Sequence, residues 1–347
     1  MKLGFVLNDV MNEPLPSTTI NLVITALRMG HEVWLMSVGD FAYDPNDIIH
    51  ANAVRASKNR FENAEEYMHH ILSEDAKRER ISVEDLDILM LRNDPAVDFD
   101  KPWAQHASLV FGCAAANHGV IVLNDPGGLR RAINKMYFQQ FPRIVRLKTL
   151  ITKNYQDILE FYHQNSNKII IKPLLGSGGR NVFLVQPDDE ANIKQMTEAV
   201  MRDGYVIAQE FFAPASEGDI RLFMLNGRPF QVNGKFAAFK RVSGGKDVRS
   251  NIHAGGSSQA VEITDKILEL AEIVRPKLVQ DGIFFAGLDI VGDKLLEINI
   301  FSPGGLGRAG RIANENFHAA MIEALERKVA YKQHYMTSFD NTEMNTL

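Results

Sequence analysis

Two acidic segments near residue 290 carry the side chains best suited to binding a hard metal ion. The dipeptide Gly292-Asp293 is typical of a hairpin turn. Asp289 lies before this turn, and Glu297 and Asn299 lie after it. Side chains alternate along a strand, so Glu297 and Asn299 share a face, and a hairpin register could place Asp289 opposite them. Such oxygen ligands, together with phosphate oxygens, suit Mg²⁺. Solvated surface charges are the alternative, but isoleucines on the other face favour the metal site.

A lysine before a glycine-rich turn indicates a phosphate-binding element. Lys172 directly follows the apolar run 169–171, and Gly176-Ser177-Gly178-Gly179 begins four residues after the lysine. Glycines allow backbone N–H groups to approach phosphate oxygens closely. An ordinary hairpin loop is the alternative, and the position of Lys172 favours phosphate. The spacing matches neither a Walker loop nor the glycine pattern of a dinucleotide site, which argues against hydride transfer.

Basic residues and glycines alternate in a third region. Asp219 and Arg221 open it, and residues 240–256 contain Arg249, Asn251 and His253. Arginine stabilises charge on oxygen through its planar fork, so this region could bind a carboxylate and a transferring phosphoryl group. A solvated loop is the other interpretation. His253 alone is a weak candidate for acid–base chemistry, because a single histidine is more often structural.

The elements that would position these residues change character along the chain. Residues 1–123 alternate strand, helix and strand, with a helix expected over 103–118, which predicts an α/β domain with a parallel sheet. Strands are then expected over 147–152, 168–172, 181–186 and 205–212, and hairpins over 221–230 and 288–297, which predicts an α+β arrangement rich in antiparallel sheet. The segment after about His334 is polar and is expected to be frayed.

Composition narrows the classes of function. The 347 residues have a net charge of −5 and no long basic run, so no electrostatic footprint for nucleic acid or an anionic membrane is expected. Cys113 is the only cysteine, which rules out an intramolecular disulfide and fits a reducing compartment. The first apolar run is too short for a signal peptide or a membrane span, so a cytoplasmic protein is expected, with a small molecule or another protein as its partner.

Taken in order, these motifs resemble the ATP-grasp superfamily, and over nearly the whole chain the sequence resembles bacterial glutathione synthetases. The matching residues are Leu123 to Pro126, Leu129-Arg130, Asn134-Lys135, Ile170 to Pro173, Gly176 to Gly179, Gln209 to Phe212, Gly218-Asp219, Arg221, Arg249, Asn251, Gly255-Gly256, Gly287 to Ile290, Glu297 to Asn299 and Ser302-Pro303. The resemblance implies a Rossmann-like preATP-grasp domain (1–124), a central lid domain (125–212), a catalytic domain (213–333) and a polar tail (334–347).

The resemblance also implies a role for each matched position. ATP would contact Lys135, Lys172, the loop formed by Gly176, Ser177, Gly178 and Gly179, the adenine hinge formed by Gln209, Glu210, Phe211 and Phe212, and Asp219. Mg²⁺ would be held by Asp289, Glu297 and Asn299. The catalytic residues would be Arg221, beside the nucleotide and its phosphates, and Arg249 and Asn251, which would meet the acyl phosphate. The peptide substrate would rest near Ser302 and Gly304.

The implied reaction joins γ-glutamylcysteine to glycine through an acyl phosphate, in a homo-oligomeric enzyme. The chain departs from the family after Ser302-Pro303, where it reads Gly304-Gly305-Leu306-Gly307-Arg308 in place of a threonine and a less glycine-rich continuation. That departure leaves open another carboxylate–amine ligase with a different peptide or amine. A non-catalytic ATP-binding protein of the synapsin-like kind is a further alternative, and the retained acids and Arg249 argue against it.

Overall fold

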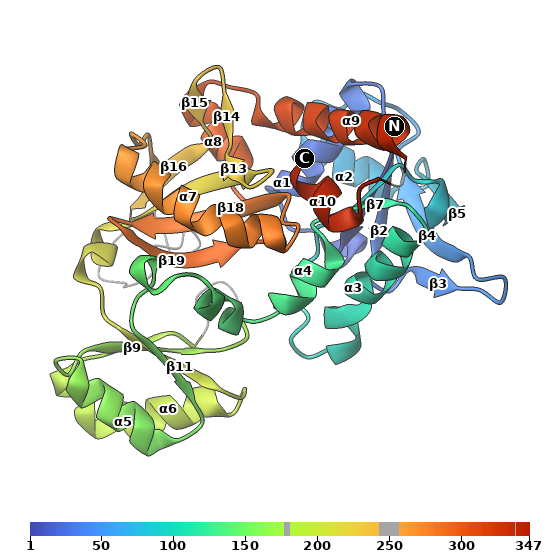
Figure 1. Ribbon diagram of the computed structural model, residues 1–347. Coiled ribbons are helices and arrows are strands. Elements are labelled where there is room, and N and C mark those ends of the chain that lie inside the picture. Colours follow the sequence, from blue (N-terminus) through green and yellow to red (C-terminus); the bar gives the residue numbers. More distant parts are fainter. Residues whose placement is uncertain (177–180, 243–256, 337) are drawn as a thin grey trace.

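The computed structural model describes residues 1–176, 181–242, 257–336 and 338–347, which form three large sheets with helices packed against them (Figure 1). The first sheet has the strand order β3-β4-β2-β1-β6-β7, and β5 pairs with β4. Its strands are β1 (Lys2–Leu7), β2 (Glu32–Ser37), β3 (Phe41–Tyr43), β4 (Ile49–Arg55), β5 (Lys77–Ser82), β6 (Ile88–Leu91) and β7 (Ile121–Leu123). Strands β2, β1, β6 and β7 are parallel, as the sequence predicted.

Helices cover both faces of this first sheet. They are α1 (Thr18–Arg28), α2 (Ala64–Leu72), α3 (Pro102–Asn117) and α4 (Pro126–Arg131). Helix α1 begins where the Ser17 hydroxyl accepts a hydrogen bond from the backbone N–H of Ile20, which satisfies one of the free donors of its first turn. Leu22, Val23 and Ala26 are completely buried on its inner face, so apolar burial fixes the helix on the sheet.

The second sheet is smaller and antiparallel, with the order β10-β9-β11-β8. It consists of β8 (Thr149–Thr152), β9 (Ile169–Pro173), β10 (Phe183–Val185) and β11 (Val206–Glu210), and it is covered by α5 (Tyr155–Gln164) and α6 (Ile193–Met201). A separate core that includes Ile158, Tyr162 and Ile169 holds the helices against the strands. Figure 1 shows this unit (green to yellow) at the lower end of the molecule.

The third sheet is antiparallel, with the order β17-β16-β12-β18-β19 and β13 paired with β12. Its strands are β12 (Asp219–Leu225), β13 (Arg228–Pro229), β16 (Ala238–Val242), β17 (Ser257–Gln259), β18 (Phe285–Val291) and β19 (Lys294–Asn299). Strands β14 (Gln231–Val232) and β15 (Lys235–Phe236) form a separate two-stranded ribbon. The helices of this part of the chain are α7 (Asp265–Gln280), α8 (Leu306–Ala313) and α9 (Phe317–Tyr335). Both predicted hairpins are present. Asn226 and Gly227 have φ of 52° and 71° in the first turn, and Gly292 has φ of 60° in the second.

The C-terminal segment contradicts the expectation of a frayed polar tail. Residues after α9 form α10 (Asn341–Thr346), which packs against β7 and α7. The Asn341 side chain accepts a hydrogen bond from the Val122 N–H at 2.8 Å and donates one to the Val122 carbonyl at 3.0 Å. Met344 and Asn345 are buried. Composition suggested fraying, but these polar side chains satisfy backbone groups of a distant strand. No described helix has the length and apolar character that crossing a membrane would require.

A buried lysine fixes the last turn of α10, and its replacement should release that helix. Lys328 of α9 is 0% exposed, and its Nζ donates hydrogen bonds to the carbonyl oxygens of Met344, Asn345 and Leu347 at 2.7, 3.2 and 2.9 Å. Lys328→Met should cost about 2 kcal/mol of local stability and speed amide hydrogen exchange in residues 341–346 by roughly 30-fold. The exposed neighbour Arg327→Met serves as the control. Unchanged exchange in the lysine variant would show that α10 is held by its other contacts.

Candidate active site

One cavity lies where the second and third sheets approach each other. Its walls come from β8, β9 and β11 on one side and from β19 and the residues after it on the other. The lining is completed by residues 132–135, 137–139 and 174–176, together with Asp94 and Ala96. In Figure 1, β19 lies above this region, and β9 and β11 lie below it. Parts of two of the motifs that the sequence singled out, Lys172 with Gly176 and Glu297 with Asn299, therefore meet in the space between two antiparallel sheets.

Two lysines reach this cavity from different elements. The Lys172 Nζ on β9 donates a hydrogen bond to Gln209 Oε1 on β11 at 2.9 Å, and the Lys135 Nζ donates one to the Gly176 carbonyl. Burial lowers the pKa of Lys172 to about 8; the charge of Glu297 opposes this shift, and the charge of Lys135 adds to it. The cluster is therefore short of negative charge, and a polyanion such as a phosphate chain would restore the balance.

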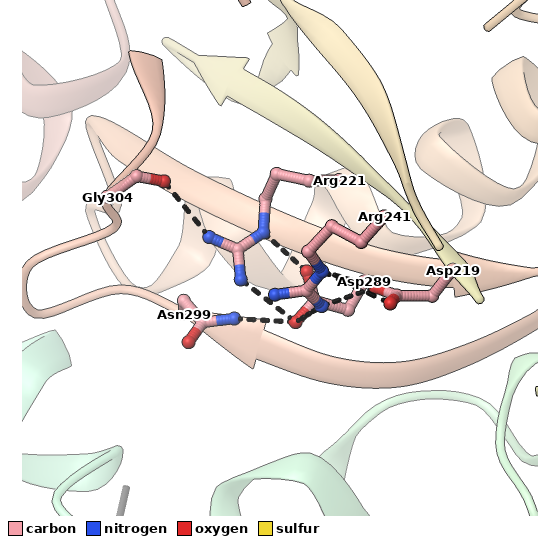
Figure 2. Close-up of polar contacts among 6 residues, drawn as sticks. All are labelled: Asp219, Arg221, Arg241, Asp289, Asn299 and Gly304. Atoms are coloured by element: carbon pink, nitrogen blue, oxygen red, sulfur yellow. Dashed lines mark hydrogen bonds and ion pairs between the residues drawn. The ribbon is translucent and has the colours of Figure 1, made fainter. Parts of the chain in front are cut away.

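Next to the cavity lies a buried network of charged side chains on β12, β16 and β18 (Figure 2). The Asp289 carboxylate accepts hydrogen bonds from the Arg221 Nε and Nη2, the latter at 3.0 Å, and the Arg241 Nη2 lies 2.7 Å from its Oδ2. Arg241 also donates to both oxygens of Asp219. Burial alone would raise the pKa of Asp289, but the two arginines hold it below its ordinary value.

This network arises from strand register. Arg221 pairs with Asp289 across β12 and β18, and Asp219 pairs with Arg241 across β12 and β16. Asp289 also pairs with Glu297 across the β18–β19 hairpin, next to a register shift between Asp289 and Ile290. The expectation that the hairpin would bring Asp289 opposite Glu297 is therefore confirmed.

Glu297 and Asn299 fit a hard cation better than Asp289 does. Both line the cavity, and Glu297 is exposed. The Asn299 amide donates a hydrogen bond to Asp289 Oδ2 at 3.2 Å, and Figure 2 shows its oxygen turned away from Asp289. A carboxylate and an amide oxygen beside a space for phosphates match the usual preference of Mg²⁺. Within the described residues, no group of three or more His, Cys, Asp or Glu side chains could hold a metal ion by itself.

The predicted site residues fall into three groups by their position relative to the cavity. Lys135, Lys172, Gly176, Gln209, Glu297, Asn299 and Ser302 line the cavity. Glu210, Phe211, Phe212, Asp219, Arg221, Asp289 and Gly304 are not among its lining residues. Ser177, Gly178, Gly179, Arg249, Asn251 and His253 lie outside the described residues.

Some members of this second group have contacts of their own. The Glu210 carboxylate accepts a hydrogen bond from the Lys148 backbone N–H at 2.7 Å, and the Lys168 Nζ lies 4.0 Å from the centre of the Phe211 ring. The Gly304 carbonyl accepts a hydrogen bond from the Arg221 Nη1 at 3.2 Å. The adenine-hinge role of residues 209–212 stays a prediction.

Sequence reasoning missed several residues at the site. Arg241 lay inside the basic region 240–256 but was not given a role, although its place one strand from Asp219 puts it in the charge network. Asp94, Tyr137 and Thr149 line the cavity from elements far apart in the chain. No local motif marks these three, so only the assembled fold could find them.

Comparisons with known proteins show the family of the chain. Residues 1–130 match the family described as "Prokaryotic glutathione synthetase, N-terminal domain", and residues 134–314 match "Prokaryotic glutathione synthetase, ATP-grasp domain". The chain is 30% identical over 338 residues to the glutathione synthetase of Synechococcus elongatus, covering 95% of this chain and 99% of that protein. It is also 30% identical over 338 residues to the Yersinia pestis glutathione synthetase, covering 96% and 99%.

Solved structures share the fold at lower identity. The D-cycloserine synthetase DcsG superposes with a TM-score of 0.62 at 14% identity, covering 94% of this chain and 100% of that one. The D-alanyl-alanine synthetase A of Vibrio cholerae superposes with a TM-score of 0.58 at 10% identity, covering 95% and 98%. These likenesses show the fold, and the sequence matches show the family: the chain belongs to the prokaryotic glutathione synthetases, which are ATP-dependent ligases of the ATP-grasp superfamily.

Proposed function

We propose that this chain makes glutathione from γ-glutamylcysteine and glycine, using ATP and Mg²⁺. The observation that carries the proposal is the cavity in which Lys135, Lys172, Glu297 and Asn299 meet between two antiparallel sheets. Positive groups for phosphates lie on one side of it, and oxygen ligands for a cation lie on the other. Membership of the glutathione synthetase family supplies the identity of the peptide and the amine.

The reaction has two steps. A carboxylate oxygen of the dipeptide's cysteine attacks the γ-phosphorus of ATP, the bond to the bridging oxygen breaks, and ADP leaves. The glycine amine then attacks the acyl carbon of the resulting acyl phosphate, loses a proton, and displaces inorganic phosphate. Phosphoryl transfer needs little covalent chemistry from a protein, so positioning and charge neutralisation carry the catalysis.

The residues of the chain divide this work. Lys135 and Lys172 neutralise phosphate charge, and the two sheets enclose the acyl phosphate, which water would otherwise hydrolyse. Glu297 and Asn299 would hold Mg²⁺, which supplies further neutralisation of phosphate charge when bound. Asp289 orients Asn299 through its hydrogen bond. Arg249 and Asn251 remain the predicted contacts of the acyl phosphate, and Arg221 remains a predicted neighbour of the nucleotide phosphates.

Three further features are part of the same proposal. The sheet boundaries support domains near 1–124, 125–212 and 213–333, with residues 334–347 belonging to the folded body through α10. The single cysteine and net charge support a cytoplasmic location and small-molecule partners, without nucleic acid or membrane. A homo-oligomer is proposed from the family resemblance alone.

The substrate pair is tested by ADP release. Gly304-Gly305-Leu306-Gly307 departs from the family pattern and favours, as the second candidate, a ligase with another acceptor amine. Discrimination of one methylene in a pocket is worth about 1 to 3 kcal/mol, so glycine should exceed alanine and serine by roughly 10- to 150-fold in kcat/KM. A preference for another amine would show that glycine is not the acceptor, and the proposed ligase mechanism would stand. If none of the tested pairs of donor and amine supported ADP release, the proposal that the chain is an enzyme would be overturned.

ATP binding should be coupled to proton uptake by Lys172. Its pKa of about 8 means that the free protein holds this lysine largely neutral above pH 8, and bound phosphates should restore the proton. We therefore expect ATP affinity to fall as the pH rises through 8, with proton uptake near pH 8.5 in calorimetry across buffers of different ionisation enthalpy. Lys172→Met should bind ATP more weakly and without this uptake. The same uptake in wild type and variant would assign the proton to another group.

A further inference from the structure

A threonine in the wall of the cavity is linked to Lys172 by a chain of hydrogen bonds. Thr149 lies on β8 and lines the cavity. Its Oγ1 donates a hydrogen bond to the Leu147 carbonyl at 3.0 Å and accepts one from the Gln209 Nε2 at 3.2 Å. The Gln209 Oε1 in turn accepts a hydrogen bond from the Lys172 Nζ at 2.9 Å. The chain therefore connects a backbone carbonyl to the lysine of the proposed phosphate site.

Strand register brings the three side chains together. β11 lies between β8 and β9 in the second sheet, and Gln209 pairs with Thr149 on one side and with Ile170 on the other. Lys172 stands two residues after Ile170, so it is a diagonal neighbour of Gln209. Directly opposite residues and their diagonal neighbours share a face of an antiparallel sheet. Thr149, Gln209 and Lys172 accordingly project from the face that lines the cavity.

The direction of the chain is fixed at its backbone end. A carbonyl can only accept, so the Leu147 carbonyl takes the single hydroxyl hydrogen of Thr149. The threonine oxygen is then left as an acceptor, and Gln209 turns its NH₂ group toward it. The amide oxygen of Gln209 consequently faces the Lys172 ammonium, which has three donors and no acceptor. A reversed amide would place its NH₂ group against the ammonium, where both groups are donors.

This arrangement prepares Lys172 for phosphate. A lysine side chain has many rotamers, and holding it in one of them costs conformational entropy. Gln209 is 6% exposed, so its amide is a fixed acceptor inside the sheet and not a mobile surface group. One N–H of the ammonium donates to this amide, which leaves two for phosphate oxygens. The lysine is therefore held before a nucleotide arrives and can bind phosphate without losing this hydrogen bond.

We propose that Thr149 is a positioning residue for ATP: it orients the Gln209 amide, which holds the Lys172 ammonium in place for the phosphates. The inference rests on the proposed function and deepens it, because it assigns Thr149 and the Gln209 side chain to phosphate binding. The family resemblance places the adenine beside residues 209–212, so a contact between the Gln209 side chain and the base is the alternative. The two roles differ in their response to a change of base.

Replacement of the threonine hydroxyl tests the chain. Thr149→Val leaves the Gln209 NH₂ group without its acceptor, and ATP binding measured by calorimetry should weaken about tenfold. Thr149→Ser keeps the hydroxyl and should bind ATP within about twofold of wild type. Thr152→Val is the matched control, because it removes a hydroxyl of the same strand that donates to Asp157 at 2.8 Å, and it should leave ATP affinity unchanged. Circular dichroism reports whether each variant is folded.

Two further measurements separate positioning of the lysine from other roles. In a Lys172→Met background, Thr149→Val should add no further loss of ATP affinity, because the residue through which it acts is absent. Inosine triphosphate shares the triphosphate of ATP and differs in its base. The ratio of the two dissociation constants should therefore be the same in wild type and in Thr149→Val. If Lys172→Met binds ATP too weakly to measure, this ratio decides.

The outcomes distinguish the inference from the proposed function. A further tenfold loss in the Lys172→Met background, or a loss of ATP affinity with unchanged affinity for inosine triphosphate, would overturn the inference and leave the proposed function standing. Unchanged ATP affinity in Thr149→Val, or an equal loss in Thr152→Val, would overturn it as well. If the wild-type protein bound no ATP, the proposed function would fail together with this inference. A loss that Thr149→Ser avoids, and that depends on Lys172 but not on the base, supports the assignment.

Discussion

Replacing Glu297 with glutamine and Asn299 with alanine together should lower kcat by about 1000-fold or more. Both side chains line the cavity, and they are the two oxygen ligands best placed for Mg²⁺. Metal neutralisation of phosphate charge is worth several kcal/mol in the transition state, which corresponds to this factor. Because Glu297 is exposed, its replacement should leave the core intact, and the thermal midpoint should change by only about 2 °C.

ADP release at varied magnesium concentration measures this effect. Asp293→Asn, in the exposed turn of the same hairpin, is the control and should retain wild-type turnover. Near wild-type activity of the double variant at low magnesium would show that the cation is held elsewhere. A large fall in thermal midpoint would instead reveal a structural role for the pair.

Asp289→Ala should be the most destabilising single change at the site. The Arg221 and Arg241 side chains are only 8% and 13% exposed and share the Asp289 carboxylate, so its loss leaves two guanidinium groups short of a counter-ion. Removing one partner of a buried ion pair costs about 3–5 kcal/mol.

The urea midpoint of unfolding, followed by circular dichroism, measures the loss. Asp293→Asn again serves as the control, since that carboxylate is 68% exposed and its ion pair with Lys294 contributes little. A change below about 1 kcal/mol would mean that Asp219 alone compensates the arginines. The charge network would then be a functional feature of the site and not a support of the third sheet.

Local patterns in the sequence predicted most of the fold. Apolar runs with turn signals located β1, β9 and the β18–β19 hairpin, and Asn226-Gly227 identified the β12–β13 turn. Strand ends were less well predicted: the strand expected over 205–212 is β11, Val206–Glu210. Alternating burial is visible in sequence, but a strand ends where its partner ends, and pairing is a long-range property.

The site was predictable only where its residues are neighbours in the chain or across a tight turn. Alternation and the Gly292-Asp293 turn were enough to place Asp289 opposite Glu297. The pairing of Asp289 with Arg241 requires the order of three strands, β16, β12 and β18, which no local pattern contains.

The contact between α10 and β7 has a consequence for association of the chains. β7 ends the first sheet, so the outward N–H and carbonyl of Val122 would be free to pair with a strand of another molecule. The Asn341 carboxamide engages both of these groups, as a neighbouring strand would, and the Asn345 amide also donates to the Val122 carbonyl at 2.8 Å. Open sheet edges are templates for aggregation, and proteins often cover them. Helix α10 thus protects the edge of the N-terminal sheet against intermolecular β-pairing.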